Sequence, residues 1–214
     1  MHKCEEISNA IIKGKVKDVK ELVNTAMEDG IPPRDILNNG MLSAMDIIGE
    51  DFAKGLVFLP DMMYASSAMK AGLEIIKPSL SQAGVNPIGR AVIGTVKGDQ
   101  HDIGKNLVAT MFEGKGIDVI DLGANVSAEQ FVEAAEKNDV GIIACSSLLT
   151  TTMGEMKNVV DLLVEKGLRD KITVMIGGAP VSEGFCKEIG ADYYTPDATT
   201  AADVAKSVLT KKQA

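Results

Sequence analysis

The 214-residue sequence is poor in aromatic residues and in residues that ligate bare metal ions. It has no tryptophan, 4% aromatic residues, three cysteines and two histidines. Cys4, Cys145 and Cys186 are far apart along the chain, so their spacing indicates neither a disulfide framework nor a pair of zinc-binding thiolates. This usage of cysteine is typical of a reducing compartment, and we expect the protein in the cytoplasm.

Long apolar runs and clusters of basic residues are also missing. No run approaches the roughly 20 apolar residues that span a bilayer, and the N-terminus lacks the apolar core of a signal peptide. Asp and Glu outnumber Lys and Arg by 30 to 22, which gives a net charge of -8. These features predict a soluble protein that binds neither membrane nor nucleic acid.

Residues 3 to about 85 carry apolar residues at three- and four-residue steps, a pattern that indicates helices. Three stripes cover residues 7–12, 19–26 and 36–52, and most of the eleven methionines lie in this half of the chain. A fourth helix is expected to begin at Pro60, a residue tolerated in the first turn, and Pro78 is expected to close or kink it. The pattern predicts a four-helix bundle.

The periodicity changes after a stretch that contains Gly84, Pro87 and Gly89. Short β-branched runs then alternate with helical segments, and Ser127 with Gln130 forms the capping box of one helix. The pattern predicts an α/β fold, a doubly wound, flavodoxin-like sheet of five parallel strands, with domains at 1–86 and 87–214. The expected strands are 91–96, 117–122, 140–145, 172–176 and 191–195.

Ligands of such sheets bind beyond the carboxyl ends of the strands, where the first loop holds His101, the only histidine outside the N-terminus. One interpretation is a solvated histidine in a loop whose Asp99 or Asp102 caps the next helix. A nucleophilic triad would need a Ser or Cys partner on a sharp elbow, and a zinc site would need three or four ligands. A corrin ring supplies four equatorial nitrogens itself, so one axial histidine, oriented by a nearby carboxylate, is enough.

Two further loops contain small residues at the expected strand ends. Residues 145–152 are rich in hydroxyl groups, and Gly177-Gly178 permits close approach of a bulky ligand to the backbone. Taken singly, the first is an ordinary loop before a helix and the second is a weak signal.

Together the three loops resemble the signature of the cobalamin-binding domain family, Asp-x-His-x-x-Gly, Ser-x-Leu and Gly-Gly. The elements are Asp99-His101-Gly104, Ser146-Leu148 and Gly177-Gly178, separated by 41 and 28 residues. Asp121-Leu122-Gly123 and Glu155-Met156 are similar to the corrinoid domain of methionine synthase. The resemblance covers nearly the whole chain.

The resemblance implies a corrinoid bound base-off, with His101 as the lower axial ligand of cobalt. Asp99 would bond the other ring nitrogen of His101, and Thr152 would end the relay from cobalt through His101 and Asp99. The following residues would complete the lower face and the slot for the displaced nucleotide tail: Asp102, Ile103, Gly104, Ser146, Leu148, Thr150, Gly177 and Gly178.

The helical half resembles the family's cap, most clearly over residues 55–62. Carried over, Phe52, Leu59 and Met62 would lie over the upper face of the corrin, where the methyl group sits. The alternative is that these side chains form ordinary bundle core, which is the usual meaning of a methionine stripe at helical spacing. The 84–89 linker is the expected hinge that lets the cap move aside.

The resemblance implies a non-enzymatic methyl carrier of an anaerobic corrinoid-dependent methyltransferase system. A substrate-specific methyltransferase would donate the methyl group, a second one would pass it to tetrahydrofolate or coenzyme M, and a reductive activase would be a further partner. Donors in such systems include methanol, methylamines, betaines and methoxyaromatics. A cobalamin-binding sensor stays an alternative, although the acidic balance disfavours DNA. A phosphate receiver would need an Asp where Cys145-Ser146 stand.

Overall fold

The computed structural model describes residues 2–83 and 86–213. The chain divides into two compact units, Met1–Pro87 with Gly114–Gly116, and Ile88–Glu113 with Ile117–Ala214. Gly84 and Val85, which belong to the expected hinge, lie outside the described residues. That each unit folds as a separate domain stays a prediction.

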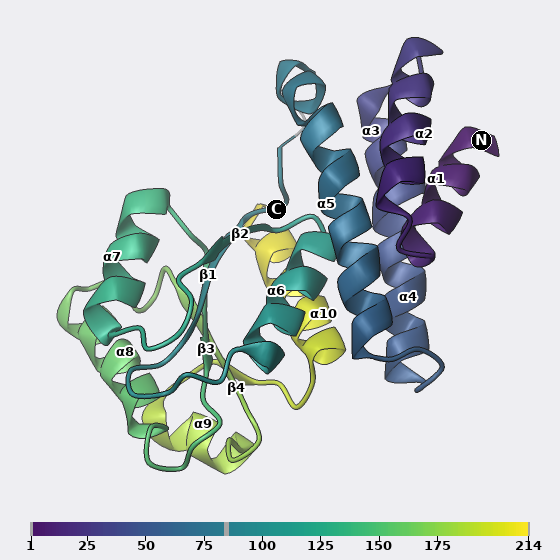
Figure 1. Cartoon of the computed structure of the whole chain (residues 1–214). Helices are drawn as coiled ribbons and strands as arrows, with labels where there is room; N and C mark the ends of the chain where they lie inside the picture. Colours follow the sequence, from purple (N-terminus) through teal and green to yellow (C-terminus); the bar gives the residue numbers. More distant parts are fainter. Residues whose placement is uncertain (1, 84–85, 214) are drawn as a thin grey trace. The chain divides into compact units, whose positions relative to one another are not determined.

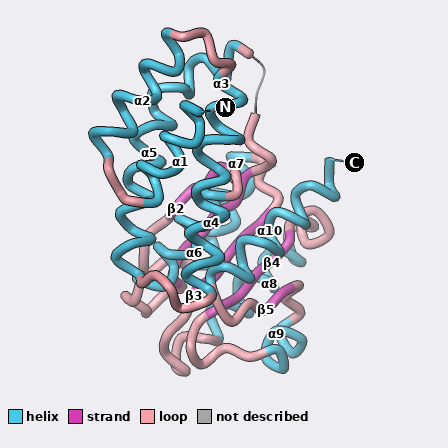
Figure 2. The backbone as a smooth tube through the Cα atoms, turned by 90° about the vertical axis from the view of Figure 1, so that its right-hand side faces the viewer, coloured by secondary structure: helices cyan, strands magenta, loops and turns pink. Residues whose placement is uncertain are grey.

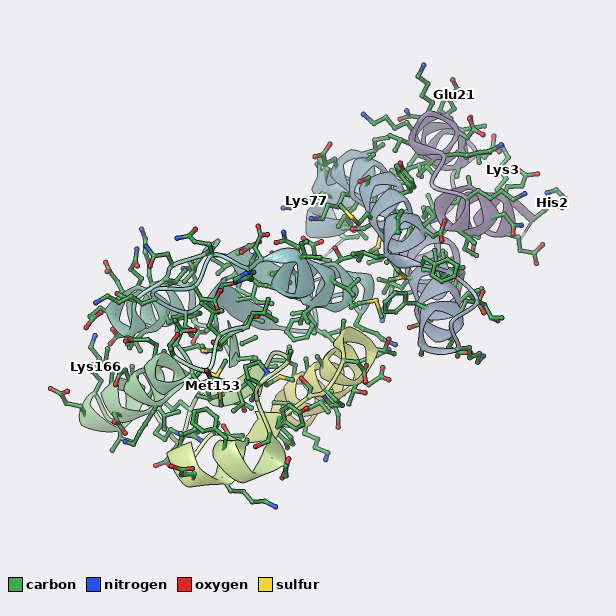
Figure 3. The ribbon with its side chains drawn as sticks, turned by 60° about the horizontal axis from the view of Figure 1, so that its bottom comes forward. His2, Lys3, Glu21, Lys77, Met153 and Lys166 are labelled. Atoms are coloured by element: carbon green, nitrogen blue, oxygen red, sulfur yellow. The ribbon has the colours of Figure 1, made fainter. Side chains whose placement is uncertain are left out.

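The first unit is helical, as predicted from the apolar stripes. Polar side chains such as His2 and Glu21 project from the outer surface of its helices (Figure 3), whereas Ile7, Val19 and Ile48 are fully buried. This separation of faces follows from the three- and four-residue spacing of the apolar positions. Its helices are α1 (His2–Ile12), α2 (Val16–Glu28), α3 (Pro33–Asp35), the π-helix η1 (Ile36–Leu42), α4 (Ser43–Ala53) and α5 (Leu59–Gln82).

Two details of this unit differ from the sequence prediction. The third stripe forms one continuous helical segment, but its first part, Ile36–Leu42, is a π-helix, which periodicity does not reveal. Of the two effects expected of Pro78, closing or kinking the last helix, closing is wrong, because α5 continues to Gln82. A proline removes one backbone donor, and here the helix continues through that loss. Gly72 of α5 lies against Val19 and Met41, where an added Cβ would come within 2.9 Å and 2.7 Å of their side chains.

The second unit is the predicted doubly wound sheet. Its described residues form five strands, all parallel, in the order β2-β1-β3-β4-β5, the flavodoxin-like order. Helices α7, α8 and α9 lie on one face of the sheet and α6 and α10 on the other (Figures 1 and 2). The elements are β1 (Arg90–Thr95), α6 (Ile103–Gly114), β2 (Asp118–Asp121), α7 (Ala128–Asn138), β3 (Ile142–Ser146), α8 (Gly154–Glu165), β4 (Thr173–Gly177), α9 (Glu183–Ile189), β5 (Tyr193–Tyr194) and α10 (Ala198–Gln213).

The local signals in the sequence act as expected in this unit. Ser127 and Gln130 form a complete capping box at the start of α7. Gly116, Gly167 and Gly190 have positive φ angles of 83°, 66° and 75° where helices end, a conformation that glycine adopts at low cost. The last strand is shorter than predicted, with two residues in place of five. None of the described helices combines the length and apolarity that crossing a membrane requires.

Candidate functional site

The register of the sheet brings the three predicted loops to one edge. Thr95 pairs with Ser146, and Ser146 pairs with Gly177, so β1, β3 and β4 end side by side. The chain leaves β1 toward β2 but leaves β3 toward β4, and the loops that follow β1 and β3 therefore diverge. This topological switch point is where open α/β sheets bind ligands.

Asp99 and His101 are in direct contact in the first loop. Oδ1 of Asp99 lies 2.7 Å from Nδ1 of His101 and also accepts the backbone N–H of His101 at 3.0 Å. The Asp99 side chain is fully buried, whereas that of His101 is half exposed. A solvent-facing imidazole is thus anchored through Nδ1 to a buried carboxylate, so Nε2 is the nitrogen that could ligate a metal.

The second carboxylate oxygen of Asp99 joins this loop to the loop after β3. Oδ2 accepts the backbone N–H groups of Leu148 at 2.7 Å and Leu149 at 3.2 Å, and the hydroxyl of Thr152 at 3.2 Å. Burial alone would raise the pKa of Asp99, but the hydrogen bonds from His101, Leu148 and Leu149 outweigh it and hold the pKa well below its ordinary value. Asp99 is therefore a carboxylate.

Ser147 is a member of this cluster that the sequence did not single out. Its hydroxyl is buried, 2.8 Å from that of Thr152 and 3.4 Å from Oδ2 of Asp99. The neighbouring Ser146, which the resemblance favoured, contributes its carbonyl to the N–H of Val96 at 3.0 Å. Successive side chains of an extended segment point to opposite sides, so Ser146 and Ser147 cannot both face Asp99. This alternation was the signal in the sequence that could have identified Ser147.

Thr95 and Asn125 also hold the first loop and were missed. The buried hydroxyl of Thr95 donates to the carbonyl of His101 at 3.0 Å. Asn125, with a φ angle of 59°, accepts the N–H of Gly98 at 2.8 Å on its side chain and donates its own N–H to the carbonyl of Asp99 at 3.0 Å. Asn tolerates this left-handed conformation better than most residues.

The glycines of the site serve two different purposes. At Gly178, with φ 133°, an added Cβ would lie 1.8 Å from the carbonyl oxygen of Ser147, so only glycine lets the loops after β3 and β4 approach. At Gly104, in the first turn of α6, an added Cβ would meet nothing within 4 Å. Gly104 thus leaves open space beside the loop that carries His101.

The remaining predicted residues differ in exposure, and Ser146, Gly177 and Gly178 are half-buried. Asp102, Ile103, Leu148 and Thr150 are exposed, with Ile103 68% accessible. The structure thus brings Asp99, His101 and Thr152 together, and places Ile103 and Leu148 on the surface near them in sequence. No group of three or more His, Cys, Asp or Glu side chains suited to holding a bare metal ion occurs among residues 2–83 and 86–213.

The predicted cap residues differ in their exposure within the helical unit. Met62 is fully buried, while Phe52 and Leu59 are partly exposed. The most exposed large apolar side chains between α4 and α5 are instead Leu56 and Phe58, 68% and 69% accessible. Asp61 holds their loop, since its carboxylate accepts the N–H of Phe58 at 2.8 Å.

Both units match known family models. Residues 89–205 and residues 3–77 each match a model described as a B12 binding domain. The chain belongs to the B12-binding family of corrinoid proteins. This membership confirms the corrinoid that the three loops implied, and the fold is the one predicted.

Relatives of this family align over almost the entire chain. A corrinoid protein of Desulfitobacterium hafniense is 39% identical over 99% of both chains, and a dimethylamine corrinoid protein of Methanosarcina barkeri is 40% identical over 96% of both. Among solved structures, the methanol:cobalamin methyltransferase complex MtaBC of Methanosarcina barkeri matches with a TM-score of 0.90 and 32% identity, covering 97% of this chain and 80% of that one. The monomethylamine corrinoid protein of the same organism matches with a TM-score of 0.55 and 37% identity, covering 94% and 96%.

Proposed function

We propose that this chain is the corrinoid methyl carrier of a methyltransferase system, with His101 as the lower cobalt ligand of a corrinoid bound base-off. The observation that carries the proposal is the 2.7 Å contact between buried Asp99 and half-exposed His101 at the switch point of the sheet. The names of the relatives support it, because they are corrinoid proteins of methylamine and methanol systems. We further infer a cytoplasmic carrier, in keeping with three free, buried cysteines.

The residues of the site fit a corrinoid. The ring needs one protein ligand, which Nε2 of His101 would provide, and Gly104 leaves room beside it. Exposed Ile103 and Leu148 offer apolar surface, and Ser146, Thr150, Gly177 and Gly178 would take the nucleotide tail between the loops. When bound, the corrinoid supplies a cobalt ion that accepts and releases a methyl group.

The protein's own contribution begins with the orientation of His101. Asp99 fixes the imidazole through Nδ1, which leaves Nε2 as the nitrogen that would face the cobalt. The Leu148 and Leu149 amides and the Thr152 hydroxyl fix Asp99 in turn. Thr152 would thus end the relay through His101 and Asp99, and Ser147 would be an additional member.

The helical unit would shield the upper face of the corrinoid with exposed apolar side chains. We assign this role to Leu56 and Phe58 together with Phe52 and Leu59, because these side chains have accessible surface to offer. Met62 would support them from within the core. The 84–89 linker would be the hinge that lets the helical unit move aside for a methyltransferase.

The partners follow from the carrier role. One is a substrate-specific methyltransferase, for which methylamines and methanol are the first donors to test, given the names of the relatives. A second methyltransferase would pass the methyl group to tetrahydrofolate or coenzyme M, and a reductive activase would restore the reduced cofactor.

Reconstitution with cobalamin tests the cofactor and its ligand. Wild-type protein should retain cobalamin through gel filtration and show the base-off, histidine-ligated absorption spectrum. His101→Gly should lose the histidine-ligated features, whereas His2→Gly, which alters the only other histidine, should keep them. A His101→Gly protein that retained the histidine-ligated spectrum would contradict the assignment, and failure of the wild type to bind cobalamin would contradict the proposed function.

Methylation trials test the role as a carrier. The reduced, cobalamin-loaded protein is incubated with isotopically labelled dimethylamine or methanol and the methyltransferase encoded next to its gene. Label should appear on the protein-bound corrinoid and then on tetrahydrofolate or coenzyme M when a second methyltransferase is added. Absence of label from the corrinoid across methanol, methylamine, betaine and methoxyaromatic donors would argue against a carrier.

A further inference from the structure

Lys105 is a buried cation in the first turn of α6. It is only 2% accessible and is one of the largest fully buried side chains among the described residues. Nζ lies 2.6 Å from both carboxylate oxygens of Asp121, at the end of β2, and 2.6 Å from Oδ1 of Asn106. These acceptors engage all three N–H groups of the ammonium, so Lys105 has no donor left for a ligand.

Stability alone does not account for a lysine at this position. Burial of an ammonium group is costly, and a cation in the first turn of a helix opposes the helix dipole. An apolar side chain of similar length would avoid both penalties. What the Lys105–Asp121 ion pair does, and an apolar side chain would not, is to connect the start of α6 to the end of β2.

That connection reaches His101 by two routes. Asp121 accepts the N–H of Gly123 at 2.8 Å, and the carbonyl of Gly123 accepts the N–H of Thr95 at 2.9 Å; Thr95 in turn holds the His101 carbonyl. Farther along the same loop, Asn125 bonds Gly98 and Asp99. The histidine loop, residues 97–102, is thereby supported by the 122–126 segment and continues directly into the helical turn that Lys105 holds.

We propose that Lys105 and Asp121 are positioning residues for His101, which fix the start of α6 to the β2–α7 loop and so hold the histidine loop in its ligating geometry. This inference rests on the proposed function for the ligand role of His101, whereas the positioning of the loop can be tested without the cofactor. Lys105 and Asp121 are not hydrogen-bonded to the imidazole, and the three N–H groups of Lys105 are engaged by Asp121 and Asn106.

Amide hydrogen exchange of the apoprotein tests the positioning directly. In Lys105→Met, the amides of Gly98, His101 and Asn125 should exchange at least tenfold faster than in the wild type, while buried amides of β3 and β4 keep their rates. Arg90→Met is the matched control, because Arg90 also pairs with an aspartate of β2, Asp118 at 3.0 Å, at the opposite end of the strand. It should leave the three loop amides unchanged.

A second readout follows the ligand after cobalamin loading. Lys105→Met should retain cobalamin but show a reduced fraction of histidine-ligated spectrum, and Arg90→Met should match the wild type. Asp121→Asn, at a half-exposed site, should change both readouts in the same direction and replaces Lys105→Met if that variant does not fold. Wild-type exchange at the three amides, or equal acceleration at every amide, would overturn the proposal. If the wild type binds no cobalamin, the proposed function fails while the exchange result still decides the positioning role.

Discussion

At the scale of single residues, Asp99 organises the site because its two oxygens accept from different loops. Oδ1 accepts from the backbone N–H of His101 and contacts its Nδ1, and Oδ2 faces the Leu148 and Leu149 amides and the Thr152 hydroxyl. Every one of these backbone partners is a donor, so the site requires an acceptor on both oxygens. A neutral amide of the same shape cannot meet that requirement.

We therefore expect Asp99→Asn to destabilise the apoprotein by about 1–3 kcal/mol, since its NH₂ group must face a backbone N–H in either orientation and leaves a buried donor without a partner. Urea denaturation followed by circular dichroism measures the change. Asp102→Asn, an exposed aspartate in the same loop, is the control and should shift the free energy of unfolding by less than about 0.5 kcal/mol. Equal stability of Asp99→Asn and wild type would contradict the hydrogen-bond assignment.

Substitutions at Gly178 and Gly104 should affect different properties, folding at Gly178 and ligand binding at Gly104. Gly178→Ala should destabilise the apoprotein by several kcal/mol or prevent folding, because its Cβ would overlap the Ser147 carbonyl at 1.8 Å. Gly104→Ala should leave the apoprotein as stable or raise its stability by up to about 1 kcal/mol, since alanine favours helices and meets no neighbour.

The same Gly104→Ala protein should nevertheless bind cobalamin more weakly, because the methyl group occupies space we assign to the corrinoid. Thermal denaturation of the apoprotein and equilibrium dialysis with cobalamin measure the two effects. Unchanged cobalamin affinity in Gly104→Ala would show that the open space beside α6 is not used by the ligand.

At the scale of elements, the sequence predicted the order and type of the strands and helices but not every boundary. Alternation of β-branched runs with amphipathic segments gave the parallel sheet, and the Ser127–Gln130 box gave the start of α7. The π-helix and the passage of α5 through Pro78 depend on backbone hydrogen bonds that side-chain periodicity does not encode. The short β5 reflects its place at the sheet edge, with only β4 as a neighbour.

For the site, the sequence predicted which loops come together but not the hydrogen bonds that connect them. Parallel strands end at one edge, so Asp99, His101 and Gly177 could be brought together from sequence alone. The roles of Thr95, Ser147 and Asn125 could not, because each depends on a hydroxyl or amide rotamer, or a left-handed backbone angle, that contacts outside its own loop select. Lys105 escaped notice because a lysine near a helix start ordinarily faces solvent.

Because β3 lies in the centre of the sheet, its buried cysteine should make folding stability depend on alkaline pH. Cys145 is buried between β1 and β4, and this burial raises the pKa of its thiol from 9.0 to about 12. Between these values the unfolded chain releases the thiol proton while the folded chain keeps it, so folding stability falls as pH rises from about 9 toward about 12. The added slope should approach about 1.4 kcal/mol per pH unit.

Urea denaturation at pH 8 to 10.5 measures this slope. Cys145→Ala lacks the thiol and should lose stability less steeply with pH than the wild type, whatever its absolute stability. Parallel pH profiles for the two proteins would show that Cys145 ionises normally in the folded state. At pH 8, Cys145 should also resist alkylation until the protein is unfolded.

At the scale of the whole molecule, the proposed carrier needs two units with different tasks. In this proposal the sheet unit would supply the ligand and the slot, and the helical unit would supply apolar cover that must be removable. A removable cover must have apolar side chains on its surface that are not buried in its own core. Leu56 and Phe58 satisfy that condition, and fully buried Met62 does not.

The two kinds of apolar residue in the helical unit should therefore respond differently to substitution. Leu56→Ser/Phe58→Ser should leave the stability of the apoprotein nearly unchanged, because both side chains are already exposed, but should raise several-fold the rate at which cyanide reaches the cobalt of bound cobalamin. Met63→Ser, at an exposed methionine of α5, is the matched control and should change neither quantity.

Met62→Ala should destabilise the apoprotein by about 2–5 kcal/mol through a core cavity. Stopped-flow absorption with cyanide and thermal denaturation measure the two effects, and cyanide access that stayed at the wild-type rate in Leu56→Ser/Phe58→Ser would mean that these side chains do not cover the cofactor.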